Sequence, residues 1–167
     1  MPVLLLAQGD AAARDLLRKA IEARYGLRPP AIESLCIQFK GRARTKIGPL
    51  STWVPVEATA LFNFPTAMRW DFIVRAVGIQ IGSGAEAFDG ASYRTTRAGK
   101  TPLALTEPDR IDSMQRRLWA IAALLLTPLG EHFVRVAIKA ESRLEATNTK
   151  LNVPIQLALR SNYLLEQ

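Results

Sequence analysis

The 167-residue sequence predicts an α+β fold in which an antiparallel β half-barrel, an incomplete barrel, wraps around one long apolar helix. Two observations lead to this fold class. Apolar and polar residues alternate with the period of a strand on both sides of a predicted helix at 109–126. The second half of that helix, 118–126, is apolar on every side, and a helix without a polar face is expected to be enclosed.

The first predicted element is an amphipathic helix at 10–25, whose apolar residues form one stripe. Gly26 is a suitable residue to end it, and Pro29 and Pro30 cannot continue it. The preceding segment, 1–9, is interpreted as a possible signal-peptide remnant or a short strand, because its apolar run is short and lacks a basic start. Residues 10–167 are then expected to form a single half-barrel domain.

Four or five strands are predicted between the two helices. Period-two alternation indicates strands at 35–46, 53–64 and 68–75, with glycines loosening the stretch after 78. The segment 85–97 is expected to form a hairpin that turns at Asp89-Gly90, a strong hairpin signal. After the apolar helix the alternation returns at 134–145 and at 153–159.

Composition and charge restrict the classes of partner and site. A net charge of +7 favours an anionic partner, either a membrane surface or nucleic acid, although an arginine-rich but otherwise ordinary soluble protein fits equally well. Cys36 is the only cysteine, so neither an internal disulfide nor a cysteine-based metal cluster can form. His132 is the only histidine, which argues against a histidine zinc site or a catalytic triad. No catalytic residue, metal or cofactor is predicted.

Three stretches resemble signatures of the bacterial lipoprotein carrier superfamily (LolA/LolB-like). FPTAMRWD at 64–71 is similar to its Pro…Arg-Trp-acidic signature, and AFDGASY at 87–93 to its Asp-Gly turn followed by an aromatic strand. LLLTPL at 124–129 falls where the carriers have a Leu/Pro-rich plug helix. The resemblance spans about 31–146. It implies a periplasmic or cell-envelope protein whose half-barrel encloses an apolar cavity for the acyl chains of lipoproteins.

Three sets of site residues follow from these patterns. The lipid-binding residues are predicted to be Phe62, Trp70, Phe72, Leu118, Ile121, Ala122 and Leu125, although a filled apolar core has the same composition. The resemblance implies that Arg69 acts as a latch on the cavity lid, whereas a surface arginine paired with Asp71 or Glu57 is the simpler alternative. An anionic surface is expected to contact the basic strand face of Lys40, Arg42, Arg44 and Lys46.

The basic strand face has a second interpretation, since charged residues also prevent sheets from pairing edge to edge. Nucleic acid is an improbable partner, because aromatic residues for base stacking are expected to be absent from that face. The predicted function is therefore a monomeric, non-enzymatic envelope protein that binds a lipid or the acyl chains of a lipoprotein. Two alternatives stay open: an interaction module with the same fold and a filled core, and a helix-grip enzyme that acts on an apolar substrate.

Overall fold

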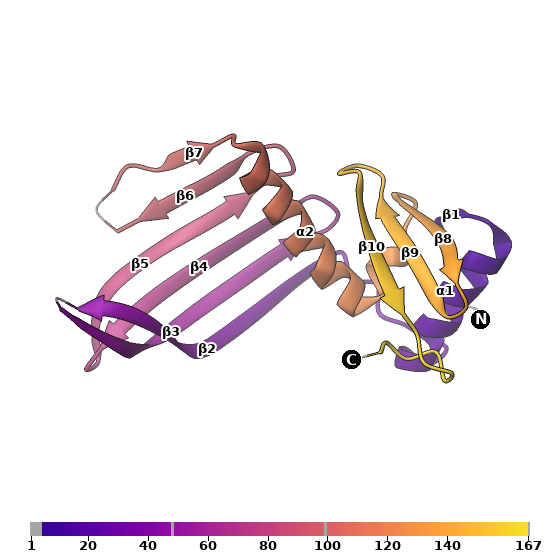
Figure 1. Ribbon diagram of the computed structural model, residues 1–167, viewed down its shortest axis with the longest axis horizontal. Coiled ribbons are helices and arrows are strands. Elements are labelled where there is room, and N and C mark those ends of the chain that lie inside the picture. Colours follow the sequence, from indigo (N-terminus) through magenta and orange to yellow (C-terminus); the bar gives the residue numbers. More distant parts are fainter. Residues whose placement is uncertain (1–4, 48, 99, 167) are drawn as a thin grey trace. The chain divides into compact units, whose positions relative to one another are not determined.

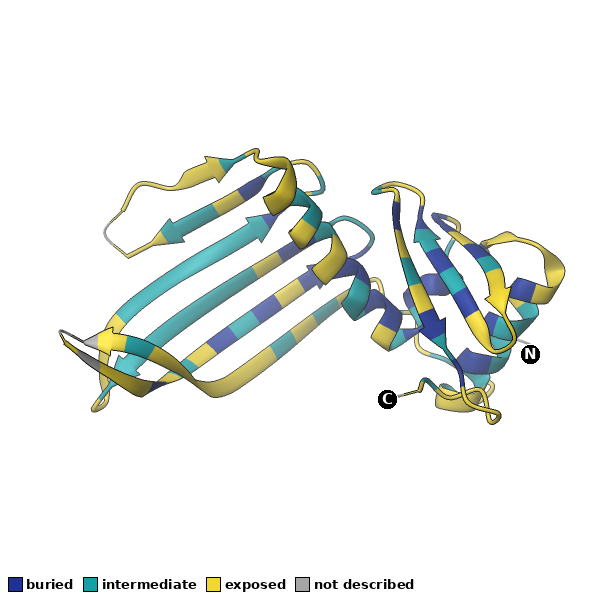
Figure 2. Cartoon of the chain, in the orientation of Figure 1, coloured by how far each residue is buried: buried dark blue, intermediate teal, exposed yellow. Residues whose placement is uncertain are grey.

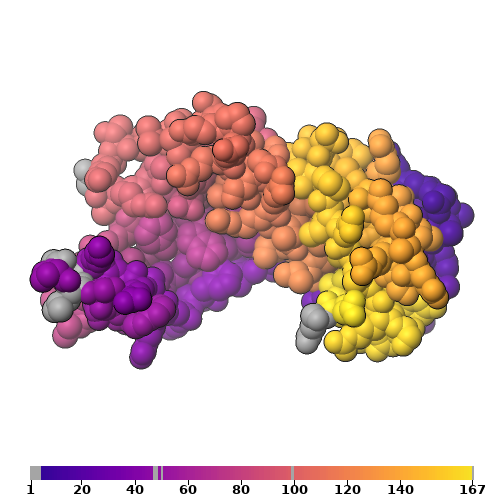
Figure 3. Space-filling view, viewed as in Figure 1, coloured from indigo at the N-terminus to yellow at the C-terminus, as the bar shows by residue number. Residues whose placement is uncertain are grey.

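The structure is a computed structural model that describes residues 5–47, 49–98 and 100–166. Strands make up 49% of it and helices 23%. The chain divides into two compact units (Figure 1). Unit 1 combines Met1–Glu33, Phe64–Thr66 and Gln115–Gln167, so it contains both the indigo and the yellow residues of Figure 3, and unit 2 combines Ser34–Asn63 and Ala67–Met114. Each unit contains one β-sheet.

The sheet of unit 1 has four strands in the order β1-β8-β9-β10. The strands are β1 (Gln8–Gly9), β8 (Val134–Ala140), β9 (Arg143–Asn148) and β10 (Val153–Ala158). β8, β9 and β10 are antiparallel, whereas β1 pairs with β8 in parallel. At this join Gly9 has a φ of 135°, and a Cβ there would lie 2.2 Å from the carbonyl oxygen of Val136. Only glycine therefore fits where the N-terminal segment meets β8.

Helix α1 (Ala11–Tyr25) forms where the sequence predicts an amphipathic helix. The Asp10 side chain caps its start, accepting a hydrogen bond of 2.7 Å from the backbone N–H of Ala13. Gly26, with a φ of 74°, ends it. The buried stripe consists of Ala13, Leu17, Ala20 and Ile21. The helix packs against β8, β9 and the short 3-10 helix η1 (Thr127–Gly130).

The sheet of unit 2 is an antiparallel meander of six strands in which each strand pairs with the next along the chain. Its strands are β2 (Ser34–Ile47), β3 (Leu50–Asn63), β4 (Ala67–Ala76), β5 (Ile79–Phe88), β6 (Tyr93–Arg97) and β7 (Leu103–Leu105). The β5–β6 hairpin turns at Asp89-Gly90, as predicted. Figure 2 shows that most residues of this sheet are half-buried or exposed, with buried positions concentrated on β3 and at the strand ends.

Helix α2 (Pro108–Leu125) is not wrapped by strands, so the predicted half-barrel is wrong. The strands form two separate sheets, neither of which is closed. Residues 108–114 of the helix belong to unit 2 and residues 115–125 to unit 1. The apolar run was expected to be enclosed on every side, yet Leu124 is 57% exposed. The enclosed side lies in unit 1, where the indole N–H of the buried Trp119 donates a 3.0 Å hydrogen bond to the Ala146 carbonyl on β9.

Three boundaries also differ from the sequence prediction. β5 runs through the glycines at 82 and 84, where the sequence predicts a loosened stretch; at Gly84 the Phe72 side chain approaches closely. The alternation at 134–145 belongs to two strands, β8 and β9, rather than one. Residues 8–9 form strand β1, while 1–4 of the possible signal-peptide remnant lie outside the described residues. Within the described part of the chain, no helix combines the length and apolar character needed to cross a membrane.

Candidate functional site

The register of unit 2 separates its side chains into two chemically different faces, since directly paired residues share a face. The first, which we call the apolar face, also includes Glu86, Thr95 and Arg97 on β5 and β6; its apolar residues are Leu35, Ile37, Phe39, Val56, Ala58, Ala60, Phe62, Met68, Trp70, Phe72, Val74, Phe88 and Tyr93. The polar face consists of Gln38, Lys40, Arg42, Arg44, Trp53, Glu57, Thr59, Arg69, Asp71, Ser83 and Thr96.

Burial is uneven along the apolar face. Phe62, Met68, Phe88 and Tyr93 are buried, and they lie at or next to the ends of β3, β4, β5 and β6. Burial raises the pKa of the Tyr93 phenol, and the neighbouring Glu86 carboxylate adds to that rise. Farther along the strands Ala58 and Ala60 of β3 are buried, whereas the larger side chains of Phe39, Trp70 and Phe72 are half-buried or exposed. An exposed contiguous apolar surface of this kind is typical of a binding site.

Phe39 and Trp70 form the centre of the uncovered part. Their ring centroids are 5.0 Å apart and their planes are tilted by 30°. The two residues come from β2 and β4, on either side of β3, whose paired residues are Ala58 and Ala60. The small side chains of the middle strand leave room for the rings to meet above it. Phe39 remains 40% exposed, so this aromatic pair offers an apolar surface rather than a filled core.

Charged groups border the aromatic patch on one side. The guanidinium carbon of Arg97 lies 4.8 Å from the centroid of the Phe72 ring, a cation–π contact. The Nη2 atom of Arg97 also lies 3.4 Å from Oε1 of Glu86. The uncovered surface therefore combines a central apolar area with one polar edge, an arrangement suited to an amphiphilic ligand.

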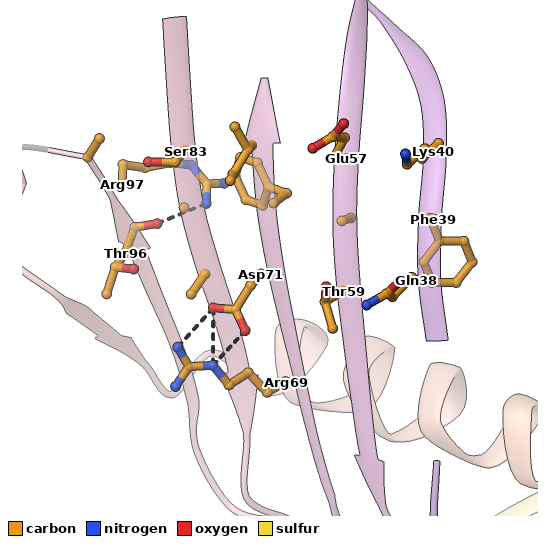
Figure 4. Close-up of a pocket in the computed structure, with 16 residues that line it drawn as sticks. Gln38, Phe39, Lys40, Glu57, Thr59, Arg69, Asp71, Ser83, Thr96 and Arg97 are labelled. Atoms are coloured by element: carbon orange, nitrogen blue, oxygen red, sulfur yellow. Dashed lines mark hydrogen bonds and ion pairs between the residues drawn. The ribbon is translucent and has the colours of Figure 1, made fainter. Parts of the chain in front are cut away.

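The sheet also has an open hollow of about 630 Å³, shown in Figure 4, whose lining includes residues of both faces. At its edge Arg69 donates two 2.8 Å hydrogen bonds to Asp71, from Nε to Oδ2 and from Nη2 to Oδ1. This pairing raises the pKa of Arg69. The hydroxyl-bearing residues Thr59, Ser83 and Thr96 also line the hollow. Neither histidine nor cysteine is among the lining residues. The carboxylates that line the hollow are Asp71, which pairs with Arg69, and Glu57, which lies 3.8 Å from Arg75.

The structure brings together three of the seven predicted lipid-binding residues, Phe62, Trp70 and Phe72, on the apolar face. The other four, Leu118, Ile121, Ala122 and Leu125, lie on the part of α2 that belongs to unit 1. Unit 1 has an apolar hollow of its own, of about 730 Å³. From α2 it is lined by Ala120, Ala123, Leu124 and the following Leu126. Residues 120, 123 and 124 lie on the opposite side of the helix from the predicted four.

The predicted surface residues all lie on the polar face. Arg69 pairs with Asp71, which is the simpler of its two interpretations. The four basic residues of β2 are exposed there. The expectation that aromatic residues would be absent from this face is wrong, because Trp53 lies directly across from Arg44 and is 63% exposed. The sequence indicates that Trp53 faces away from the core, because it directly precedes the inward Val54. Only the β2–β3 register, however, places Trp53 beside Arg44.

No group of three or more His, Cys, Asp or Glu side chains that could hold a metal ion is present among the residues that the structure describes. Comparison of the chain with protein-family models, with curated proteins and with solved structures gave no match.

Proposed function

We propose that the uncovered apolar face of unit 2 binds an acyl chain of a lipid or of a lipoprotein, and that the protein is a non-enzymatic carrier or binding protein of the cell envelope. The observation that carries this proposal is the half-exposed aromatic surface of Phe39, Trp70 and Phe72, with the polar pair Glu86–Arg97 at its edge. The sequence resemblance of 31–146 to lipoprotein carriers supports both the ligand class and the location.

An open face predicts how strongly the affinity depends on the length of the acyl chain. A fully buried CH₂ group contributes about 0.8 kcal/mol, and a chain lying on one face buries roughly half of that surface. Each added CH₂ then contributes about 0.4 kcal/mol, which corresponds to an increase of about twofold in affinity. A closed cavity would give an increase of about fourfold per CH₂. The dependence of affinity on chain length therefore reports the kind of site as well as its existence.

The test uses delipidated protein and fatty acids of about ten to sixteen carbons, with affinity measured by displacement of a fluorescent fatty acid. We expect saturable binding that strengthens about twofold per CH₂. Val74→Lys and Ile73→Lys form a matched pair, because both positions are half-buried neighbours on β4 and face opposite sides of the sheet. Val74→Lys should weaken binding by at least about tenfold, whereas Ile73→Lys should leave it within about twofold.

A third variant, Leu124→Lys, tests the apolar hollow of unit 1 as the acyl site. We expect Leu124→Lys to bind fatty acids with the same affinity as the parent protein. If it alone abolishes binding, the ligand occupies unit 1 and the assignment to the sheet is wrong. If the parent shows no saturable binding at any chain length, the protein is not an acyl carrier, and an interaction module becomes the better hypothesis. Far-UV circular dichroism on each variant separates loss of the site from loss of the fold.

A further inference from the structure

One end of the unit 2 sheet collects three of its chain connections. Consecutive strands of an antiparallel meander alternate in direction, so the β2–β3, β4–β5 and β6–β7 connections share one end (Figure 1). We call this the hairpin end; it comprises residues 41–56, 74–82 and 98–102. Its described side chains leave out those of 47, 48, 50 and 99.

The hairpin end exposes large apolar side chains where polar turn residues are usual. Val77 is 99% exposed, Ile79 69% and Trp53 63%. Val77 and Gly78 have φ values of 48° and 78°, and this two-residue hairpin turn normally takes Asn-Gly or Asp-Gly. A β-branched residue at positive φ is strained. The backbone at residue 77 favours asparagine, so turn formation does not explain why a valine is present. Contact of the valine side chain with an apolar medium would explain it.

The same end concentrates the positive charge of the chain. It carries Arg42, Arg44, Lys46, Arg75 and Lys100 and no aspartate or glutamate. Five cations and no carboxylate give it a net charge of +5, most of the +7 of the whole chain. Arg44 donates a 2.9 Å hydrogen bond from Nε to the Ser51 hydroxyl. Arg75 lies 3.8 Å from a carboxylate oxygen of Glu57, just outside this end, whereas no ion pair joins the other four cations to a carboxylate among the described residues.

We propose that the hairpin end docks on an anionic lipid bilayer surface. In this arrangement Val77, Ile79 and Trp53 enter the interface between headgroups and acyl chains, and the cations lie against the lipid phosphates. Tryptophan suits this depth because its ring is apolar and its N–H is polar. The proposal goes beyond acyl binding by the apolar face and does not rest on it.

The exposed apolar side chains favour a membrane over a nucleic acid as the partner. A phosphate backbone would be bound by the cations alone, and exposed aliphatic residues at the turn would contribute nothing to it. A single tryptophan also gives no row of stacking platforms for successive bases. Removing an aliphatic side chain should therefore weaken lipid binding without changing binding to a polyanion, which separates the two partners experimentally.

The test measures co-flotation of the protein with vesicles of phosphatidylcholine alone and of phosphatidylcholine with phosphatidylglycerol in equal parts. We expect strong binding only to the mixed vesicles, and a decrease at about 0.5 M salt, where the screening length is only about 4–5 Å. Brominated phosphatidylcholine in the mixed vesicles should quench the parent's tryptophan fluorescence. This quenching should be lost in Trp53→Phe, because Trp53 is the tryptophan at the hairpin end.

Two variants test the two components separately. Arg42→Gln/Arg44→Gln should weaken binding to mixed vesicles by about 25-fold, about fivefold for each cation. Arg14→Gln/Lys150→Gln removes equal charge from exposed positions in unit 1 and should change binding by less than about twofold. Val77→Asn should weaken vesicle binding several-fold while raising the unfolding temperature, because asparagine accepts positive φ more readily than valine. A fold defect cannot explain a loss of binding in a more stable variant.

Three results would overturn the proposal. The first is equal binding to neutral and mixed vesicles, and the second is an equal loss in the two double-glutamine variants. The third is unchanged vesicle binding in Val77→Asn together with saturable binding of single-stranded oligonucleotides that is lost in Arg42→Gln/Arg44→Gln. That combination would identify a general polyanion site. The fatty-acid displacement assay contains no vesicles, so a failure here leaves its result unaffected and the two proposals can be rejected independently.

Discussion

The ring of Phe72 lies against Gly84 on the neighbouring strand, so close that a Cβ at residue 84 would be 2.7 Å from its Cζ atom. The same Cβ would lie 2.6 Å from the backbone oxygen of Thr96. Gly84 is thus the position that allows the aromatic ring to cross β5 and reach Arg97. The shape of the apolar face depends on the lack of a side chain at residue 84 as much as on the aromatic residues.

We therefore expect Gly84→Ala to destabilise unit 2 by about 1–3 kcal/mol through overpacking. Gly82→Ala is the matched control, because it lies two residues earlier on the same strand and its Cβ would meet only the Val74 Cβ at 3.9 Å. That variant should be within about 1 kcal/mol of the parent. Urea unfolding measures both free energies, and equal values for the two variants would show that the Phe72 ring can move aside.

Breaking the Arg69–Asp71 pair should have little effect on stability. Both side chains are substantially exposed, 57% and 40%, so we expect Asp71→Asn and Arg69→Ala each to cost at most about 1 kcal/mol. Acyl binding should also be unchanged, since the pair lies on the polar face. Thermal unfolding and the fatty-acid displacement assay measure the two effects. Loss of acyl binding in Arg69→Ala at unchanged stability would instead support a latch.

Asn148 is fully buried and joins three backbone groups of unit 1. Its Nδ2 donates to the Pro65 carbonyl at 3.1 Å, and its Oδ1 accepts from the N–H groups of Lys150 and Leu151. Asn148→Ala leaves these partners unsatisfied, so we expect a loss of about 2–3 kcal/mol in the free energy of unfolding. Asn162→Ala removes an exposed asparagine cap and should cost no more than about 1 kcal/mol. A small effect at position 148 would mean that water replaces the side chain.

Ala122 is fully buried in α2, and Leu124, two residues on, is exposed. We expect Ala122→Phe to overpack unit 1 and to cost about 1–3 kcal/mol, while Leu124→Phe should be within about 1 kcal/mol of the parent. Differential scanning calorimetry provides the comparison. If Ala122→Phe is as stable as Leu124→Phe, an open space lies beside Ala122, which the burial of this residue does not indicate.

Asp89 should contribute a pH-dependent stabilisation to the β5–β6 hairpin. Hydrogen bonds from the backbone N–H of Ser92, then from that of Ala91 and from the Ser92 hydroxyl, lower the pKa of its carboxyl group. A lowered folded-state pKa stabilises the protein above the unfolded-state value of about 3.9, and this stabilisation is lost as the pH falls through the folded-state pKa. Asp89→Ala should thus be less stable than the parent at neutral pH, with a gap that narrows in acid. A gap independent of pH would exclude the ionised carboxylate as the cause.

Local features of the fold were predictable from the sequence, and the assembly of the strands was not. Asp10, the apolar stripe and Gly26 define α1 by their own chemistry, and Asp89-Gly90 defines its hairpin in the same way. The apolar run at 118–126 was misinterpreted because periodicity shows that a face avoids water but not which partner covers it. Strand alternation predicts that Phe62, Trp70 and Phe72 share one face, and the register places them on one face. The position of Trp53 beside Arg44 depends on the β2–β3 register, which the alternation within either strand leaves open.

Unit 1 is assembled from both ends of the chain, and this determines the order in which the protein can fold during synthesis. Gln8 of β1 pairs with Arg135 of β8, so the ribosome must make most of the chain before that pair can form. At about 5–20 residues per second the delay is on the order of 10 s. All the strands of unit 2 are complete earlier, since they end at Leu105. For that interval the apolar stripe of α1 has no β8 or β9 to cover it, so it stays uncovered longer than any strand of unit 2 waits for its neighbour.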